Sequence, residues 1–406
     1  MTLDLDFVRS QFPAFDEAVL QGQAFFENAG GSYTCAQVID RLTRYYTQRK
    51  VQPYAPYEAS RLAGEEMDEA RVRLADIMGV DTDEVSFGPS TTQNTYVLSQ
   101  AFATFLEPGE AIVVTNQDHE ANSGPWRRLA ERGIEVREWK IDPETGTLDP
   151  EALNDLLDEK VRLVCFPHCS NVVGEINPVT EITAIAHAAG AFVCVDGVSY
   201  APHGIPNVGE LGPDIYMFSA YKTYGPHQGI MVMRRGLGET LPNQGHHFNG
   251  DSLYKRFTPA GPDHAQVAAS AGMADYIDAL AGHHAIEGDA AARGAGVHDL
   301  MRAHEEALLQ PLLDYAAAKN SVRLIGPQQA AARAPTVALA SQENAETLAQ
   351  ELVKHGIMAG GGDFYAQRPL AAMGVDLSKG VLRLSFTHYT SKAEIDQLLN
   401  ALDDIL

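Results

Sequence analysis

The chain has 406 residues, of which 45% are hydrophobic and 21% are charged, and these are ordinary proportions for a globular protein. Because one simple core rarely serves a chain of this length, two domains are expected. The formal net charge of −24 argues against nucleic acid or an anionic membrane surface as a partner, since both repel an acidic protein. An anionic substrate would therefore need arginines placed locally in its site.

The N-terminal segment and the cysteines indicate a cytoplasmic protein. Residues 1–6 lack the basic region and apolar stretch of a signal peptide, and no apolar run approaches the roughly 20 residues that a membrane helix needs. The histidine pairs at 246–247 and 283–284 lack a third ligand at metal-site spacing, so no metal is expected. The cysteines lack the spacing of a disulfide framework or a zinc site: they are Cys35, Cys165, Cys169 and Cys194.

From about residue 60, helical and strand patterns alternate along the chain. Short apolar strands that alternate with helices predict a mostly parallel sheet with helices on both faces. Helices are expected at 65–78, 92–105, 121–132, 150–157 and 179–188, and strands at 111–115, 134–138, 162–166, 191–195, 215–218 and 230–233.

After about residue 262 the composition changes, and an Ala-rich region begins. We expect a large domain over residues 20–262 and a small C-terminal α/β domain over residues 263–406, which also includes residues 1–19. The glycines at 360–362 are expected to form a flexible turn at the mouth of the site. In this second half, helices are expected at 265–285, 287–318, 346–355 and 391–405, and strands at 336–340 and 381–386.

A lysine and an aspartate follow two nearby strands of the expected sheet. Lys222 emerges from a small-residue turn after strand 215–218, and Asp196 ends the strand that begins at 191. Ligands of open α/β sheets bind beyond the carboxyl ends of the strands. Enzymes that use pyridoxal 5′-phosphate (PLP) need this pair, because the lysine amine holds the cofactor aldehyde as a Schiff base and the carboxylate keeps the pyridine nitrogen protonated. Taken singly, each residue is more often part of an ordinary turn.

Three further strand ends contain polar residues that suit such a cofactor. Ser90, Thr91 and Thr92 stand at a helix start, where amides and hydroxyls cradle a phosphate, although an ordinary helix cap has the same pattern. His119 follows strand 111–115 and can stack on a flat ring or remain a solvated loop histidine. Asn171 can bond a ring hydroxyl or simply belong to a turn.

Together, these motifs resemble those of the class V aminotransferase superfamily, most closely its cysteine desulfurase and selenocysteine lyase-like branch. The resemblance extends from residue 25 to the C-terminus. It implies the fold-type I PLP-dependent transferase fold, with a mostly parallel sheet in a large domain and a smaller C-terminal α/β domain, and it implies a homodimer. The residues that carry it are Asn28-Ala29-Gly30, Ser90-Thr91-Thr92, Asp118-His119 with Asn122, Ser170-Asn171, Asp196-Gly197, Ser219 with Lys222, and Arg383 with Ser385.

The resemblance also implies individual roles. Lys222, Asp196 and His119 would be catalytic, and the substrate would be an α-amino acid. Its carboxylate would bind to Arg383, with Asn171 and Asn28 also contacting the substrate. Apart from the resemblance, the position of Tyr365 on its loop indicates that it also borders the substrate. The residues implied to bind the cofactor are Ser90, Thr91, Thr92, His119, Asn171, Asp196, Ser199, Ser219, Tyr221 and Lys222.

The departures from the family pattern bear on the reaction. Desulfurases carry a cysteine on a small-domain loop, whereas Tyr365 stands there in this chain and no cysteine follows Cys194. Ser199 replaces a usual glutamine, and Tyr221 replaces a usual histidine. We therefore expect aminotransfer on an α-amino acid through a Lys222 Schiff base. A C–S or C–Se lyase of the desulfurase type is the alternative, and both use the same residues.

A rival from another class is a non-catalytic binding protein on a PLP-enzyme scaffold. The joint presence of Lys222, Asp196 and Arg383 argues against it, since a scaffold without chemistry does not need all three. The sequence leaves the identity of the amino-acid substrate open.

Overall fold

The largest sheet has seven strands in the order β2-β8-β7-β6-β5-β3-β4. The structure is a computed structural model that describes residues 2–406. The pairs from β4 to β7 are parallel, and β8 runs antiparallel to β2 and β7, so the mostly parallel sheet is confirmed. The strands are β2 (Val85–Gly88), β3 (Ala111–Thr115), β4 (Glu135–Trp139), β5 (Val161–Pro167), β6 (Phe192–Asp196), β7 (Ile215–Ser219) and β8 (Gly229–Met233).

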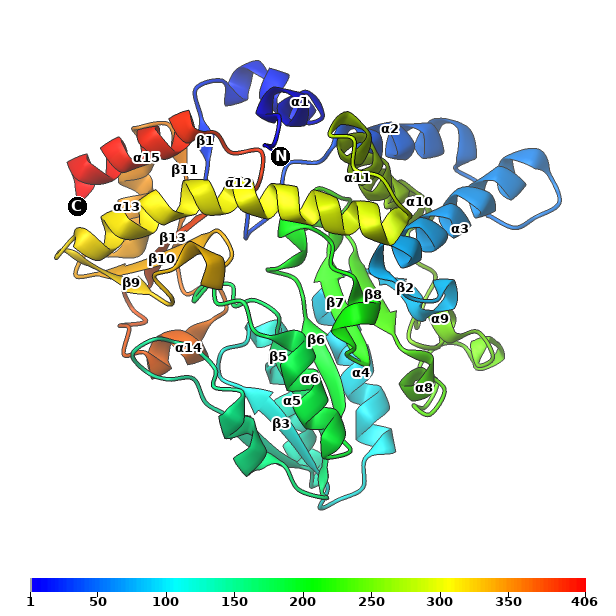
Figure 1. The fold of residues 1–406 in the computed structure, drawn as a ribbon. Helices are drawn as coiled ribbons and strands as arrows, with labels where there is room; N and C mark the ends of the chain where they lie inside the picture. The colour runs from blue at the N-terminus through cyan, green and yellow to red at the C-terminus, as the bar shows by residue number, and fades with distance from the viewer. Residues whose placement is uncertain (1) are drawn as a thin grey trace.

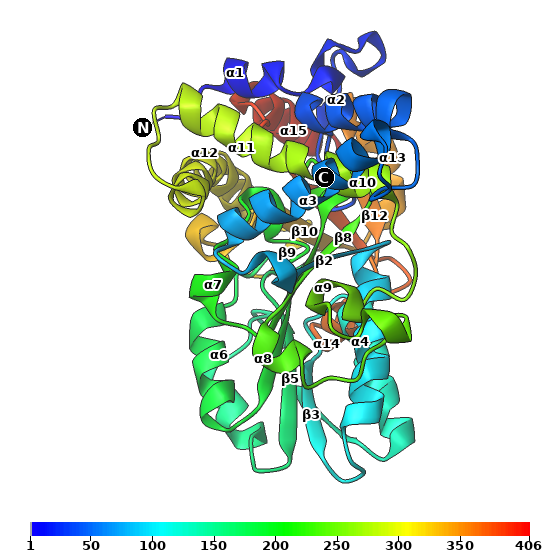
Figure 2. The ribbon, with the colours of Figure 1, turned by 90° about the vertical axis from the view of Figure 1, so that its right-hand side faces the viewer.

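Helices cover both faces of this sheet, because successive side chains of a strand point to opposite faces. Along β5, Val164 and Phe166 belong to the core that includes α6 (Val179–Ala188), whereas Leu163 and Cys165 belong to the core that includes α4 (Thr91–Phe105). Figure 2 shows α6 and α4 on opposite sides of the strands. The central strands are therefore apolar throughout, as buried parallel strands are.

A second, smaller sheet is antiparallel and has the order β12-β13-β10-β9. Beside it, β1 (Ala24–Phe25) pairs in parallel with β11 (Ile357–Met358). Leucines of α13 (Ala345–Val353) and α15 (Lys392–Ile405) pack in the core of this sheet. The strands of the sheet are β9 (Val322–Ile325), β10 (Thr336–Ser341), β12 (Gly360–Gly362) and β13 (Val381–Ser385).

The long helix α12 (Ala290–Ala318) connects the two halves of the molecule (Figure 1). Its Val297 and Met301 lie in the core of the larger half, and its Leu309 and Leu312 lie in the core of the smaller half. No helix within residues 2–406 has both the length and the apolar character needed to cross a membrane. The other helices are α1 (Leu5–Ser10), α2 (Ala36–Arg44), α3 (Glu58–Met78), α5 (Gly124–Arg127), α7 (Val208–Leu211), α8 (Arg235–Gly238), α9 (Leu253–Arg256), α10 (His264–Ala269), α11 (Ala271–His283) and α14 (Gln367–Ala372).

Several expected helices are shorter or more broken than the sequence pattern predicts. The helix expected at 121–132 consists of α5 between two 3-10 turns. It is broken because Pro125, in the first turn of α5, lacks the amide that a continuous helix needs. The helix expected at 150–157 is a 3-10 helix, Glu151–Leu156. The helix expected at 265–285 is divided at Ser270. The domain limits at residues 19 and 262 stay a prediction.

The expectation of a flexible turn at the three glycines is wrong. They form the edge strand β12, which pairs with β13. A β-carbon on Gly361 would lie 2.2 Å from the backbone carbonyl of Ala345, closer than side-chain atoms approach. The glycines therefore let the edge strand pack directly against the start of α13, a close backbone approach that only glycine permits.

Candidate functional site

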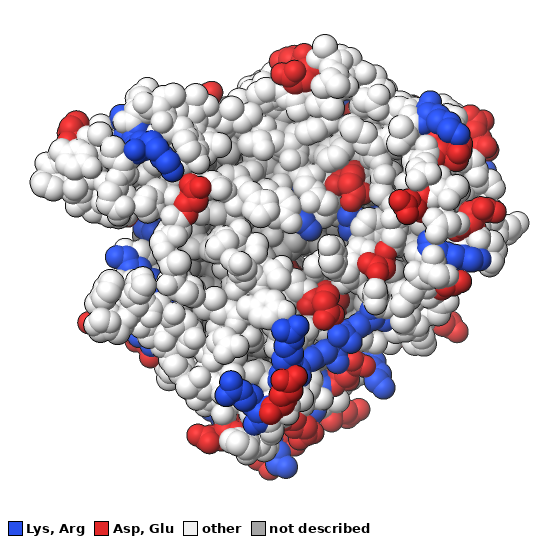
Figure 3. All heavy atoms as spheres, turned by 180° about the vertical axis from the view of Figure 1, so that it is seen from behind, with Lys and Arg blue, Asp and Glu red and all other residues white. Residues whose placement is uncertain are grey.

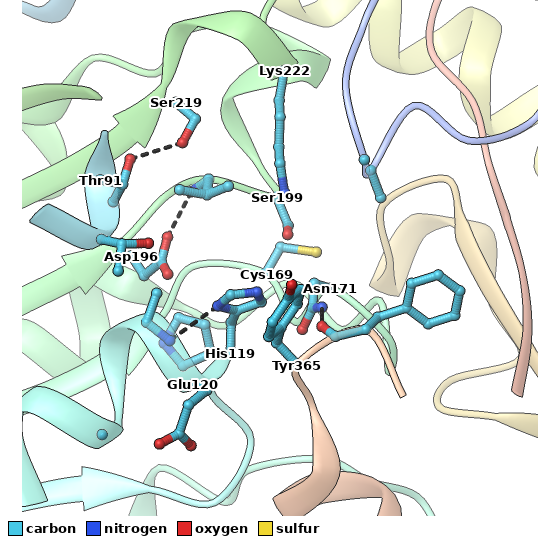
Figure 4. Close-up of a pocket in the computed structure, with 18 of the residues that line it drawn as sticks. Thr91, His119, Glu120, Cys169, Asn171, Asp196, Ser199, Ser219, Lys222 and Tyr365 are labelled. Atoms are coloured by element: carbon cyan, nitrogen blue, oxygen red, sulfur yellow. Dashed lines mark hydrogen bonds between the residues drawn. The ribbon is translucent and has the colours of Figure 1, made fainter. Parts of the chain in front are cut away.

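The carboxyl ends of five strands of the large sheet open into one cavity of about 620 Å³ (Figure 4). Residues of the small-sheet half close it from the other side. The structure brings together most residues expected from the sequence, and those that line the cavity are Thr91, Thr92, His119, Asn171, Asp196, Ser199, Ser219, Tyr221, Lys222, Tyr365 and Arg383. Residues that the sequence analysis did not assign also line it, among them Glu27, Tyr96, Glu120 and Arg128.

Lys222 and Asp196 are buried in this cavity with shifted pKa values. Lys222 ends a 3-10 turn after β7, and burial, with a contribution from Arg383, lowers its pKa to about 8. Burial raises the pKa of Asp196 to about 6, although its Oδ1 accepts a hydrogen bond of 2.9 Å from the amide of Val198. Figure 4 shows Lys222 and His119 reaching the cavity from opposite sides. The amine of Lys222 can thus lose its proton far more readily than a solvated lysine.

The turn between β2 and α4 forms a polar cradle. The hydroxyls of Thr91 and Ser219 lie 2.8 Å apart, at the positive N-terminal end of a 15-residue helix. Gly229 lies opposite this turn, and a β-carbon there would be 2.5 Å from the amide nitrogen of Thr91. The close approach leaves the first amides and hydroxyls of α4 beside the cavity, an arrangement that suits a phosphate.

Two expected residues do not line the cavity. The hydroxyl of Ser90 caps α4 by accepting a hydrogen bond of 3.2 Å from the amide of Gln93. Asn28 is buried behind the cavity, where its Oδ1 accepts a hydrogen bond from the Tyr389 hydroxyl. Asn28 lines a separate small cavity that Ser199 also borders. The structure thus gives the Ser90 hydroxyl a capping bond and holds Asn28 away from the main cavity.

His119 and Tyr365 lie side by side in the cavity, with ring centroids 5.4 Å apart. Burial, together with the charges of Lys222 and Arg383, lowers the pKa of His119 to about 4. The imidazole is therefore neutral at pH 7, and its Nδ1 accepts a hydrogen bond of 3.0 Å from the amide of Ala121. A neutral ring in this position suits stacking on a flat ligand.

Arg383 is buried on β13 and has its guanidinium partly engaged. Its Nη2 donates a hydrogen bond of 2.6 Å to Glu27 Oε1, and its Nη1 donates one of 3.3 Å to the Asn171 carbonyl. The ring of Phe364 lies 3.8 Å from the guanidinium carbon. Glu27 was not predicted to be a site residue, although it directly precedes Asn28 of the family motif and follows an apolar run, as Asp196 does.

The loop that contains Tyr365 is held over the cavity by two hydrogen bonds. Asn171 Nδ2 donates to the Phe364 carbonyl, and the Glu120 amide donates to the Tyr365 carbonyl, each over 2.9 Å. Phe364 and Tyr365 have φ angles of 52° and 57°, a left-handed conformation that is strained for residues other than glycine. Such strain at a site is typical of functional loops.

Cys169 is the cysteine that lines the cavity, and its thiol is not activated. Burial raises its pKa to about 12, and its sulfur lies 3.2 Å from the carbonyl oxygen of Gly174. All four cysteines of the chain are free and buried. A nucleophilic cysteine needs a lowered pKa, so the cavity has no cysteine thiolate at neutral pH.

Comparison with known proteins places the chain in a family. Residues 24–398 match the family model described as Aminotransferase class-V. The chain belongs to the class V aminotransferase family. It is 33% identical to the aminotransferase-like protein FGM3 of Gibberella zeae, over 100% of this chain and 99% of that protein. It is 30% identical to a cysteine desulfurase of Serratia proteamaculans, again over 100% and 99%.

A solved structure shows the same fold. The cysteine desulfurase of Thermococcus onnurineus NA1 superposes with a TM-score of 0.85 at 23% identity, covering 100% of this chain and 98% of that chain. Because the identity is low, this likeness establishes the fold alone. It confirms the expected fold-type I architecture.

Class V aminotransferases and cysteine desulfurases use PLP, and the chain is a PLP-dependent enzyme. The residues of the cavity fit this cofactor. The Thr91 and Ser219 hydroxyls suit its phosphate, buried Asp196 suits its ring nitrogen, and the Lys222 amine suits its aldehyde. Asn171 Oδ1 is buried without a hydrogen-bond partner among residues 2–406, which leaves an acceptor for a polar ligand.

Proposed function

We propose that this enzyme transfers the amino group of an α-amino acid to a 2-oxo acid. The observation that carries the proposal is the absence of an activated thiol, among residues 2–406, from a cavity whose lysine, aspartate and arginine suit PLP chemistry. Removal of sulfur through a protein persulfide needs a thiolate, whereas aminotransfer needs only the lysine, the aspartate and the carboxylate-binding arginine.

The chain's own residues hold the cofactor in this proposal. Thr91, Ser219 and the first amides of α4 bind its phosphate, and His119 packs its neutral ring against the cofactor ring. Asp196 keeps a proton on the ring nitrogen. When bound, PLP supplies an aldehyde that accepts the amino group and a ring that takes up electrons from the substrate Cα.

Lys222 and Arg383 act on the substrate. The Arg383 guanidinium binds the α-carboxylate, which positions Cα beside Lys222 Nζ. Because its pKa is lowered to about 8, Nζ takes the proton from Cα near neutral pH and delivers it again later. Tyr365 and Phe364 border the space left for the substrate side chain.

A C–S lyase without a protein thiol is the second candidate. The relatives described as cysteine desulfurases favour it, and β-elimination uses the same lysine, aspartate and arginine. Cys169 does not supply the usual persulfide, because burial raises its pKa to about 12. This lyase would release sulfur directly to solution or to an external acceptor.

A single-turnover reaction distinguishes the two candidates. The holoenzyme is mixed with alanine, aspartate, glutamate, serine, cysteine or cysteine sulfinate, and the cofactor and products are identified by mass spectrometry. Pyridoxamine 5′-phosphate with a 2-oxo acid supports aminotransfer. PLP recovered with pyruvate, alanine or released sulfur supports the lyase. Lys222→Ala should abolish both reactions, and unchanged turnover in this variant would overturn the role proposed for Lys222. A wild-type holoenzyme that forms no product from any of these amino acids would support a non-catalytic protein.

We further propose that two copies of the chain form a homodimer. Although the chain has 54 acidic and 30 basic side chains, the middle of the face in Figure 3 is largely free of them. The exposed apolar side chains include Tyr46, Tyr54, Tyr57 and Phe248, and aromatic residues of this kind are enriched in interfaces. Light scattering of the holoenzyme tests this, since a mass near 44.0 kDa would contradict a dimer.

The cytoplasm is the compartment we propose. All four cysteines are free thiols, which a reducing compartment preserves. Cell fractionation with an antibody to the chain tests this assignment.

A further inference from the structure

The carboxylate of Glu27 pairs directly with Arg383 in the wall of the cavity, from a segment far away in the sequence. Residues 24–25 pair with β11, and Glu27 forms an isolated parallel bridge with Ser385 at the end of β13. These pairings place Glu27 Oε1 2.6 Å from Arg383 Nη2. Arg383 is 3% exposed and the Glu27 side chain is 29% exposed, so the pair is partly removed from water and less screened than a surface pair.

Two glycines leave the space that the Glu27 carboxylate fills. A β-carbon on Gly30 would lie 2.8 Å from Glu27 Oε1, and a β-carbon on Gly360 would lie 2.8 Å from Glu27 Oε2. A side chain at either position would push the carboxylate away from Arg383. The slot is therefore shaped for this carboxylate, which argues against a chance surface pair.

The hydrogen bonds of the pair are incomplete on the acidic side. Glu27 Oε2 is buried and has no hydrogen-bond partner among residues 2–406, and Glu27 borders the cavity. Among residues 2–406, Glu27 is the one acidic residue with a carboxylate oxygen within 4.0 Å of a guanidinium nitrogen of Arg383. An incoming carboxylate thus meets an arginine whose charge is already balanced, while an unused acceptor oxygen waits for a donor.

We propose that Glu27 makes the Arg383 site selective for carboxylates that carry a neighbouring ammonium, namely α-amino acids, over 2-oxo acids and simple carboxylates. This inference rests on the proposed function, in which Arg383 binds the substrate carboxylate. Two carboxylates on one guanidinium repel each other strongly in a poorly solvated site. An α-ammonium brings a positive charge and three donors to Glu27 Oε2, whereas a 2-oxo acid offers only further acceptors.

Selectivity of this kind combines attraction with a built-in repulsion, because discrimination is a difference between two affinities. Glu27 weakens the binding of every carboxylate at Arg383, and its attraction to an ammonium compensates for this only in ligands that have one. In the PLP form of the enzyme, the amino-acid substrate is then retained on first encounter, and a 2-oxo acid, which reacts with the pyridoxamine form, binds only weakly. Glu27 is thus a specificity-determining residue beside the carboxylate site.

A matched pair of ligands tests the proposal on the holoenzyme. 2-Aminoisobutyrate has no proton on Cα and cannot be turned over by proton removal, and isobutyrate is the same acid without the ammonium. The holoenzyme is first reduced with borohydride, which fixes Lys222 to the cofactor, so that the amine of 2-aminoisobutyrate cannot replace Lys222 and the affinity reports the Arg383 site. Calorimetry gives the affinity of each for wild type and for Glu27→Gln, which keeps the size and an acceptor for Arg383 but removes the charge. We expect Glu27→Gln to bind isobutyrate at least roughly tenfold more tightly and to lose at least about tenfold of the preference for 2-aminoisobutyrate.

Glu120→Gln is the control, because it removes a cavity-rim charge that is paired with Arg368 at 3.2 Å and is half-exposed. It should change either affinity by less than about twofold, since an exposed pair is well screened. If Glu27→Gln leaves the preference unchanged or weakens both ligands equally, Glu27 only orients Arg383 and the proposal is wrong. Should Glu27→Gln not fold, Glu27→Asp, which withdraws the carboxylate from Arg383, must shift the preference in the same direction.

Arg383→Gln separates this inference from the proposed function. Loss of isobutyrate binding in Arg383→Gln, with the cofactor still bound, supports the carboxylate site on which both depend. Unchanged binding of both ligands in Arg383→Gln would overturn the proposed function itself. If Arg383→Gln loses isobutyrate binding as expected but Glu27→Gln keeps the wild-type preference between the two ligands, only the selectivity proposed for Glu27 is overturned.

Discussion

Asp196 and Lys222 face the same cavity, and burial shifts their pKa values toward each other, to about 6 and about 8. Each charge also stabilises the other, since Lys222 lowers the pKa of Asp196 and Asp196 raises that of Lys222. At pH 7 the aspartate is mostly ionised, and an appreciable fraction of the lysine is a neutral amine. Shifted pairs of this kind are typical of active sites.

The lowered pKa of Lys222 predicts how attachment of the cofactor depends on pH. Only the neutral amine attacks the aldehyde, so the rate at which PLP attaches to cofactor-free protein should rise roughly tenfold per pH unit below about pH 8 and then level off. Stopped-flow absorbance of the protein-bound cofactor gives the rate. A rate that keeps rising toward pH 10, as for an ordinary lysine, would show that the pKa is not lowered.

The hydroxyls near the start of α4 should differ in their effects on cofactor binding and on stability. Thr91→Val and Ser219→Ala each remove a hydroxyl of the cradle, so each should weaken PLP phosphate binding by roughly five- to thirtyfold. Ser90→Ala should instead cost about 1 kcal/mol of folding free energy through the lost cap and change cofactor affinity by less than about twofold. Equilibrium dialysis with thermal unfolding measures both. A Ser90→Ala variant that loses the cofactor as readily as Thr91→Val would contradict the assignment.

The sequence predicts the large sheet and its strand-end residues because both depend on local patterns. Strand 111–115 and helix 179–188 have the expected limits. Asp196 ends its strand and Lys222 follows its strand, as expected. A period of two in an apolar run, or a turn after it, is visible within a few residues. The half of the cavity that contains the proposed catalytic residues is therefore accessible from sequence.

The half of the cavity that is proposed to bind the substrate depends on contacts that no local pattern records. Glu27 and Arg383 are separated by 356 positions, and the edge strand β12 is visible only once Gly361 packs against the start of α13. The side-chain positions of Ser90 and Asn28 also depend on their partners, the Gln93 amide and the Tyr389 hydroxyl. Such pairings are set by tertiary packing.

Asp118 should make the stability of the protein depend on pH. It is fully buried, with hydrogen bonds from Thr115 Oγ1 and Asn122 Nδ2, and burial raises its pKa from 3.8 to about 8. The unfolded chain loses this proton near pH 4 and the folded chain near pH 8, so the free energy of unfolding falls as pH rises between these values.

Asp118→Asn removes this titration, so wild type should lose stability relative to Asp118→Asn as the pH rises from 4 to 8. The difference in the free energy of unfolding between the two proteins should change by on the order of a few kcal/mol across this range. Calorimetry of both proteins at several pH values measures it. Parallel curves would mean that Asp118 is ionised in the folded state.

Gly361→Ala should destabilise the small-sheet half and disturb the substrate site together. The new β-carbon would lie 2.2 Å from the Ala345 carbonyl, so β12 must move away from α13, and we expect a loss of roughly 2 kcal/mol or more. Because Gly360 and Gly361 pair with Arg383 and Leu382, the carboxylate site should weaken as well. Gly282→Ala is the control, since a β-carbon within α11 meets no atom within 4 Å and should stabilise the helix by about 1 kcal/mol. Chemical denaturation and isobutyrate titration of both variants measure the two effects, and a Gly361→Ala protein as stable as wild type would show that the edge strand tolerates a side chain.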